Sequence, residues 1–266
     1  MRVAAIQHDI VWEQGEQTRA HVRPMIAEAA AGGARLIVLS EMYATGFSME
    51  PERIAEDEGG PNEQFLIDAA AEHGAHVIAS IAQRGADGQY RNNAVLARPD
   101  GTVTRYAKIH PFTFAGEHER YAAGTGHCTV DVDGLRVSLF VCYDLRFADE
   151  FWATALDTDC YVVVANWPAP RRDHWRTLLR ARAIENQAFV VGTNRIGSGG
   201  RLDYAGDSAI VLPFGKALEA SGGGVGWGSE EILLHDVTAD EVAETRAKWP
   251  FLQDRRDEED VGGGEG

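Results

Sequence analysis

Residues 137–147 read VSLFVCYDLRF, an apolar stretch that breaks off at a thiol and is followed at once by polar side chains. The continuous apolar residues before Cys142 are typical of a buried β-strand. The polar residues Tyr143, Asp144 and Arg146 follow directly. A strand that served only to pack the core could have continued with apolar residues. Strand ends in α/β sheets open onto the crevice where ligands bind. The pattern therefore predicts a thiol that faces a cavity.

Strands and helices alternate on both sides of this stretch. Strands are expected over 3–9, 35–41, 76–84, 90–101, 102–108, 160–167, 188–195, 208–213 and 230–236, and a hairpin over 131–144. Helices are expected over 16–31, 61–74, 173–187 and 238–249, the last capped by Thr238. Turn signals at 86–88 and 133–134 join neighbouring strands into hairpins. This order predicts an α/β fold with helices layered on a mixed sheet, in one domain over residues 1–250.

Three Gly-rich segments have no expected regular structure. Segments 197–200 and 222–228 lack the spacing of a phosphate-binding loop and do not stand between a strand and a helix, so both are interpreted as flexible loops. Residues 251–266 are charged and Gly-rich, which predicts a tail that is disordered at its end.

Composition narrows the classes of function. The chain has 266 residues, with 25 basic against 41 acidic side chains and a net charge of −16, a balance that repels nucleic acid and anionic membranes. The apolar runs are too short for a membrane span, and the N-terminus turns polar too soon for a secretory signal, so a cytoplasmic protein is expected. Only three lysines are present; a salt-rich cytoplasm and a codon bias explain this equally well.

The chain has three cysteines, none in a C-x-x-C pair. This number and spacing argue against a disulfide framework and against a zinc site. Neither Cys128 nor Cys160 lies in a motif, and buried packing is expected for both. No metal and no cofactor are predicted.

Cys142 is one of three reactive side chains that each follow an apolar strand. The others are Glu41, after RLIVLS, and Lys108, after TVTRYA. Taken singly, a strand cysteine is more often a small buried hydrophobe, and a strand-end glutamate or lysine is more often a solvated surface residue. Together they form a complete catalytic set, because Glu41 can take the thiol proton and Lys108 can stabilise an oxyanion. The backbone N–H of Tyr143 is the natural second oxyanion donor.

A Cys-His dyad is the competing hypothesis. His8, His110, His118 and His174 lie near promising segments, but none stands in a motif that resembles the cysteine protease signatures. The Glu-Lys-Cys set is therefore the preferred interpretation.

The motifs LSEMYATGFS, YAKIHPF and VCYDLRF, in this order and spacing, resemble those of the nitrilase superfamily of carbon–nitrogen hydrolases, whose triad is Glu-Lys-Cys. The resemblance continues in GEHERYAAG, where Glu117 matches a second, structural glutamate expected to orient Lys108. It extends from AAIQHDI to KWPFLQDRRD, nearly the whole chain, and the segment 165–197 is most similar to the omega-amidase branch.

This resemblance implies a four-layer αββα sandwich that pairs into a homodimer or a higher homo-oligomer, and a thiol hydrolase that needs no cofactor. The implied reaction converts 2-oxoglutaramate or 2-oxosuccinamate to the dicarboxylate and ammonia through a cysteine thioester. An amidase acting on an N-carbamoyl compound or on deaminated glutathione remains an alternative, and so does a non-catalytic binding subunit. The latter should have lost a triad residue, whereas this chain keeps all three.

An omega-amide carries a distant carboxylate, so its pocket needs a fixed cation or several hydrogen-bond donors. Pocket candidates by position are Tyr43, Asn166, Trp167, Arg171 and Arg172. Arg146 is instead expected to pair with Asp144 and to brace the loop after the thiol. In the helix that follows, Arg182 and Glu185 are expected to brace the core, with Glu185 not a catalytic acid.

Overall fold

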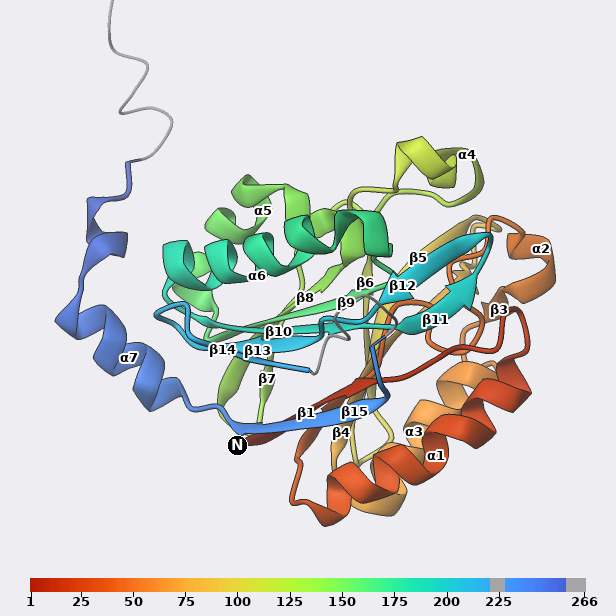
Figure 1. The fold of residues 1–266 in the computed structure, drawn as a ribbon, viewed down its shortest axis with the longest axis horizontal. Coiled ribbons are helices and arrows are strands. Elements are labelled where there is room, and N and C mark those ends of the chain that lie inside the picture. Colours follow the sequence, from red (N-terminus) through yellow and green to blue (C-terminus); the bar gives the residue numbers. More distant parts are fainter. Residues whose placement is uncertain (221–227, 257–266) are drawn as a thin grey trace, which may run out of the picture.

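Two β-sheets pack face to face between two layers of helices (Figure 1). The computed structural model describes residues 1–220 and 228–256. Helices α1 (Gly15–Ala31) and α3 (Pro61–His73) cover one side of the pair of sheets, while α5 (Ala148–Ala153) and α6 (Arg172–Asn186) cover the other. The chain thus has the predicted four-layer αββα sandwich.

The first sheet is mixed. Its strands lie in the order β15 (Glu231–Asp236), β1 (Arg2–Gln7), β2 (Leu36–Val38), β4 (His76–Arg84), β5 (Tyr90–Ala97) and β6 (Val103–Ala107), with β3 (Glu56–Asp57) paired to β4. Strands β1, β2 and β4 are parallel, and β5 is antiparallel to both β4 and β6. Strands β2 and β6 therefore run in the same direction, and their carboxyl ends lie on the same side of this sheet.

The second sheet has a parallel centre. Its order is β14 (Ala217–Glu219), β13 (Ala209–Val211), β10 (Phe189–Asn194), β9 (Cys160–Ala165), β8 (Leu135–Val141) and β7 (Thr129–Val132). Strands β8, β9 and β10 run parallel. Strands β11 (Ile196–Gly199) and β12 (Leu202–Ala205) form a separate two-stranded hairpin.

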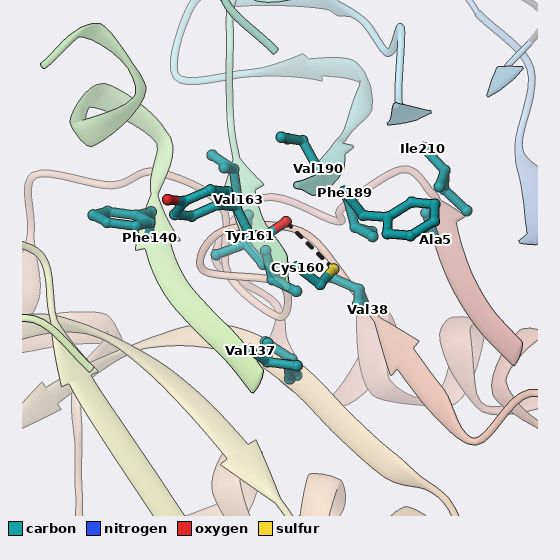
Figure 2. Packing of buried hydrophobic residues seen from close by; sticks show 14 of the residues in the cluster. Ala5, Val38, Val137, Phe140, Cys160, Tyr161, Val163, Phe189, Val190 and Ile210 are labelled. Carbon is teal, nitrogen blue, oxygen red and sulfur yellow. Dashed lines mark hydrogen bonds between the residues drawn. The ribbon is translucent and has the colours of Figure 1, made fainter. Parts of the chain in front are cut away.

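The main core lies between the sheets. Strand β1 shows why, because Val3 and Ala5 join the cluster shared with the second sheet whereas Ala4 and Ile6 pack toward α1 and α3. Alternate side chains of a strand point to opposite faces, so the first sheet is buried on both. Figure 2 shows part of the shared core, in which Cys160 lies fully buried as expected. Cys128, by contrast, is only partly buried.

Short helices and the last helix complete the chain. Helices α2 (Pro51–Ile54) and α4 (Glu117–Arg120) are single turns within long connections. Helix α7 (Ala239–Lys248) begins after Thr238, whose hydroxyl accepts a hydrogen bond from the Glu241 backbone N–H at 3.1 Å, which confirms the expected cap. In the described part of the chain, no helix is long and apolar enough to cross a membrane.

Two expectations for Gly-rich segments can be compared with the structure. Segment 197–200 is not a simple loop, because most of it belongs to the β11–β12 hairpin. Of segment 222–228, all but Gly228 lies outside the described residues. In the tail, Phe251–Asp254 forms a short 3₁₀ helix with Leu252 buried, and residues 257–266 lie outside the described residues.

Candidate active site

The ends of strands from both sheets supply the candidate catalytic side chains. Glu41 follows β2 and Lys108 follows β6 in the first sheet, while Cys142 follows β8 in the second. The regular part of β2 is shorter than predicted and stops at Val38, so Glu41 stands in the turn beyond the strand. The structure brings together three residues that are far apart in the sequence.

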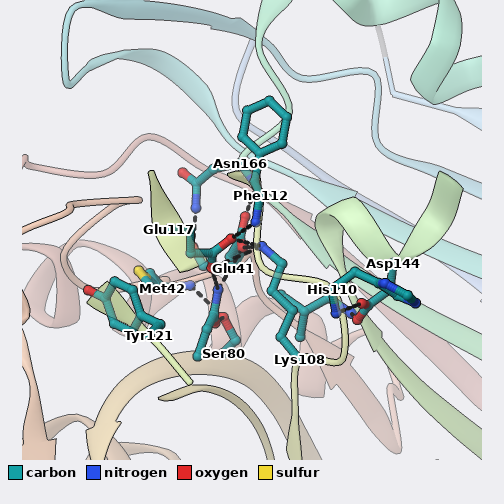
Figure 3. A network of polar contacts seen from close by, with 12 residues as sticks. Glu41, Met42, Ser80, Lys108, His110, Phe112, Glu117, Tyr121, Asp144 and Asn166 are labelled. Carbon is teal, nitrogen blue, oxygen red and sulfur yellow. Dashed lines mark hydrogen bonds and ion pairs between the residues drawn. The ribbon is translucent and has the colours of Figure 1, made fainter. Parts of the chain in front are cut away.

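Lys108 lies between two glutamates (Figure 3). Its Nζ is 3.0 Å from Glu41 Oε1 and 2.8 Å from Glu117 Oε2, and all three side chains are buried. Burial acts to lower the pKa of Lys108, yet the two carboxylates raise it above the ordinary lysine value. Lys108 is therefore a fixed cation. Glu117 holds it in place, which is the role that the resemblance implied for this glutamate.

Glu41 is oriented by contacts that sequence reasoning missed. Asn92 on β5 donates a hydrogen bond from Nδ2 to Glu41 Oε1 at 2.8 Å, and the Ser80 hydroxyl on β4 donates to Asn92 Oδ1 at 2.8 Å. From the other sheet, the Asn166 backbone N–H donates to Glu41 Oε2 at 2.8 Å. One signal was available for Ser80, which interrupts an apolar strand, whereas Asn92 lies in the polar start of β5.

Cys142 has a strained backbone. Its φ of +46° lies in the left-handed region, an uncommon conformation for a residue other than glycine. A short 3₁₀ helix, Cys142–Arg146, starts at this residue and turns the chain sharply away from β8. Strain of this kind persists only where surrounding contacts enforce it, and it clusters at functional sites.

Asp144 provides those contacts. Its buried carboxylate accepts hydrogen bonds from the backbone N–H groups of Val141 and His110, at 3.0 and 2.8 Å, and from the Tyr106 hydroxyl at 2.8 Å. Burial raises the pKa of Asp144 to about 6. The prediction of an Asp144–Arg146 ion pair is wrong, because the Asp144 carboxylate points inward to these donors.

The loop after the thiol is also held from the helix side. Arg182 on α6 donates from Nε and Nη2 to the Leu145 carbonyl at 3.1 and 2.8 Å, and its Nη1 lies 2.9 Å from Glu185. The two residues were expected to brace the core; Arg182 is buried and holds the loop after Cys142, while Glu185 pairs with it from a partly exposed position. Glu185 is thereby engaged in packing the helix.

The electrostatic surroundings of Cys142 disfavour a free thiolate at rest. Burial raises the pKa of this thiol well above its usual range and the Glu41 carboxylate raises it further, while the Lys108 ammonium opposes them. A neutral thiol beside a carboxylate can react as a nucleophile when the carboxylate removes its proton during the attack. The arrangement can therefore perform base-assisted thiol chemistry.

Cys142 opens into a cavity of about 210 Å³. The residues that line it are Phe47, Met49, Lys108, Phe112, Ala115, Cys142, Tyr143, Arg146, Asn166, Trp167, Pro168, Arg171, Gly200 and Leu202. Of the sequence-predicted pocket residues, Asn166, Trp167 and Arg171 are therefore in place.

Two pocket candidates lie elsewhere. Tyr43 is fully buried and donates its hydroxyl to the Asn62 carbonyl at 2.8 Å, because the turn after Glu41 directs it back into the first helical layer. Arg172 forms an ion pair with Asp207, and its Nη2 lies 2.7 Å from the carboxylate.

Two arginines bring positive charge to the cavity. The Arg146 guanidinium lies 4.8 Å from the centre of the Trp167 ring and donates to His174 Nδ1 at 3.1 Å, and the Arg171 guanidinium lies 5.4 Å from the centre of the Phe112 ring. Within residues 1–220 and 228–256, neither makes an ion pair with a carboxylate. The cavity thus suits a small anionic molecule. Residues 1–220 and 228–256 contain no group of His, Cys, Asp and Glu side chains that could hold a metal ion.

Comparison with known proteins identifies the family of the chain. A family model described as carbon-nitrogen hydrolase matches residues 2–247. Over 260 residues the chain is 36% identical to the omega-amidase YafV of Escherichia coli K12, with 96% of each protein covered. It is 32% identical over 259 residues to the 2-oxoglutaramate amidase of Bacillus subtilis 168, with 96% of this chain and 97% of that protein covered.

A solved structure is similar throughout. The CN-hydrolase superfamily protein from Xanthomonas campestris, described with an arsenic adduct in its active site, superposes with a TM-score of 0.89 at 35% identity, covering 97% of both chains. The family model spans most of the chain, and relatives above 30% identity are covered almost completely. The chain belongs to the carbon–nitrogen hydrolase family.

Proposed function

We propose that this protein is an omega-amidase, which hydrolyses the terminal amide of 2-oxoglutaramate or 2-oxosuccinamate to the dicarboxylate and ammonia. The observation that carries the proposal is one cavity in which the Cys142 thiol, with Glu41 and Lys108 beside it, faces two arginines that have no carboxylate partner in the described chain. A substrate with an amide at one end and a carboxylate at the other matches this distribution. The names of the E. coli and B. subtilis relatives support the same activity.

Acylation follows from the positions of the groups. Glu41 takes the Cys142 proton as sulfur attacks the amide carbon, and the Lys108 ammonium and the Tyr143 backbone N–H stabilise the oxyanion. Glu41 then gives that proton to the nitrogen as the carbon–nitrogen bond breaks, so ammonia leaves and a thioester remains. Each oxyanion donor is expected to contribute roughly 10²–10³-fold in rate.

Deacylation uses the same base. Glu41 removes a proton from water as the oxygen attacks the thioester, and the collapse of the second oxyanion expels the sulfur. The proton returns to Cys142, which restores the thiol. Glu117 transfers no proton in this scheme; it positions Lys108 through their 2.8 Å contact.

The decisive experiment measures ammonia release from 2-oxoglutaramate by the purified protein, in low and in molar salt, with Cys142→Ala as the control. Release that disappears in the variant is the expected result. A folded wild type that releases none would overturn the omega-amidase assignment and redirect the search within the family. Carbon dioxide accompanying ammonia from an N-carbamoyl compound would identify a carbamoyl hydrolase, and no turnover of any amide would indicate a binding subunit.

We also propose that the protein works as a homodimer in the cytoplasm. An exposed apolar surface, formed by Ile184, Phe214, Trp249 and Phe251 beside α6, supports an interface between two copies. The three free cysteines fit a compartment that keeps cysteines reduced. Light scattering coupled to size exclusion tests the assembly; a wild type that elutes as a monomer, or a Phe251→Ser variant that stays dimeric, would argue against this interface.

A further inference from the structure

The candidate pocket has two walls that come from distant parts of the chain. One is the loop carrying Phe47 and Met49, and the other is the turn of the β11–β12 hairpin, which contributes Gly200 and Leu202. The hairpin belongs to neither large sheet. Its base is bound by the Ile196 backbone N–H, which donates to the His8 carbonyl at 3.1 Å, and side-chain contacts position the rest.

Trp12 lies directly against the backbone of both walls. A methyl group added at Gly46, which precedes Phe47, would come within 2.9 Å of Trp12 Cε3, and one added at Gly199 would come within 2.6 Å of the same atom. At Gly200 it would come within 2.6 Å of Cη2. Real Cβ atoms essentially never approach so closely, so the three glycines form a slot that fits the indole and leaves no room for a side chain.

The segment that carries Trp12 is itself fixed to the first wall. The backbone N–H of the next residue, Glu13, donates to the Thr45 carbonyl at 2.9 Å. The Glu13 carboxylate accepts a hydrogen bond from the Ser48 hydroxyl at 2.6 Å. The indole therefore extends from one wall and supports the other.

A buried arginine holds the base of the hairpin at the same place. Arg195 donates to the carbonyls of Ile196 and Ser198, at 2.9 and 3.1 Å, and its Nη2 lies 2.7 Å from Asp9 Oδ1. This cation fixes where the hairpin leaves β10. The turn at 200–202 lies against Trp12 at Gly200, and β12 also contacts the 3₁₀ helix Ala169–Arg171.

We propose that the Trp12 indole is the spacer that sets the separation of the two pocket walls, and hence the size of molecule that reaches Cys142. The proposal rests on the proposed function in taking this cavity as the substrate pocket. Trp12 is a positioning residue, because it does not line the cavity. Without the indole, the turn at 200–202 loses its support and discrimination by size falls.

The test measures size selectivity at Cys142 without an amide substrate. Wild type and Trp12→Ala are alkylated with N-methylmaleimide and with the bulkier N-phenylmaleimide, and modification of Cys142 is followed by peptide mass spectrometry. We expect the preference of Cys142 for the small reagent to fall by roughly tenfold in Trp12→Ala. Trp12→Phe, which keeps part of the ring, should retain most of the preference, and Trp152→Ala on α5 serves as the control.

Gly199→Ala alters the contact between Trp12 and the hairpin on the hairpin side and keeps the indole. Its methyl group must push the hairpin away from Trp12, so the same loss of selectivity is expected even if Trp12→Ala fails to fold. An unchanged reagent ratio in a folded Trp12→Ala or Gly199→Ala variant would overturn the spacer role. Because alkylation needs no turnover, that result is distinguishable from a wild type that releases no ammonia, which would overturn only the proposed function.

Discussion

The Lys108 ammonium lies 3.0 Å from the Glu41 carboxylate, although 67 residues separate them in the chain. Both side chains are buried, so water does not screen the pair. Two buried charges persist only when each has a partner and further hydrogen bonds, which Glu117 and Asn92 supply here. The charges of the site therefore depend on one another, and replacing one residue changes the others.

The first prediction concerns the thiol. Replacing Glu41 with Gln removes the negative charge that raises the pKa of Cys142 and leaves Lys108, which lowers it. The alkylation of Cys142 by iodoacetamide should then shift to lower pH, while amidase activity falls roughly 10²–10⁴-fold because the base is lost. Cys128 in the same protein is the internal control, and an unshifted Cys142 profile would contradict the coupling.

A second prediction concerns stability. Lys108→Met leaves the Glu41 and Glu117 carboxylates buried without their cation, which should lower the free energy of unfolding by about 3–5 kcal/mol. The double variant Lys108→Met/Glu117→Gln should recover part of this loss, because one buried charge is removed. Urea unfolding measures both, with the exposed Lys216→Met as the matched control. A loss no larger than that of the control would show that the charges of Glu41, Lys108 and Glu117 are solvated.

The two pocket arginines should affect binding rather than chemistry. Arg146→Gln and Arg171→Gln each remove a cation from the cavity, and charge-assisted hydrogen bonds are worth about 1.5–3 kcal/mol. KM for 2-oxoglutaramate should rise roughly 10- to 100-fold, while a neutral amide such as propionamide is hydrolysed as before. Equal effects on both substrates would indicate a structural role instead.

Acid should destabilise the protein through His8. This ring is buried against Ser40 and the Asp9 carbonyl, and burial lowers its pKa to about 4. The unfolded chain takes up the proton first as pH falls below about 6.5, so the stability contributed by neutral His8 is present above that pH and is lost toward pH 4. The full contribution is about 3 kcal/mol.

Urea unfolding at pH 7 and pH 4.5 measures this effect. The difference between the two pH values should be smaller in His8→Gln than in the wild type, since Gln does not titrate. His73→Gln, at a partly exposed position near the end of α3, should behave like the wild type. If His8→Gln loses as much stability in acid as the wild type does, other groups carry the effect.

Much of the architecture was predictable because its determinants are local. Apolar runs of strand length, amphipathic helical stretches and turn residues identified most strands and helices, and Thr238 identified the start of α7. The strand-end rule singled out Glu41, Lys108 and Cys142, because parallel strands bring their carboxyl ends to one edge. The motif order around those residues identified the family.

The tertiary structure alone decided where the side chains beyond those strand ends point. Tyr43 turns into the helical layer and Asp144 toward backbone donors, whereas Arg146 reaches the cavity, and no local pattern distinguishes these outcomes. The partners of Trp12 are likewise supplied by glycines more than 30 and more than 180 residues away. A residue just past a strand has no periodicity to fix its direction. Its orientation follows from which distant segment satisfies its hydrogen bonds and fills its space, and that is known only once the chain has folded.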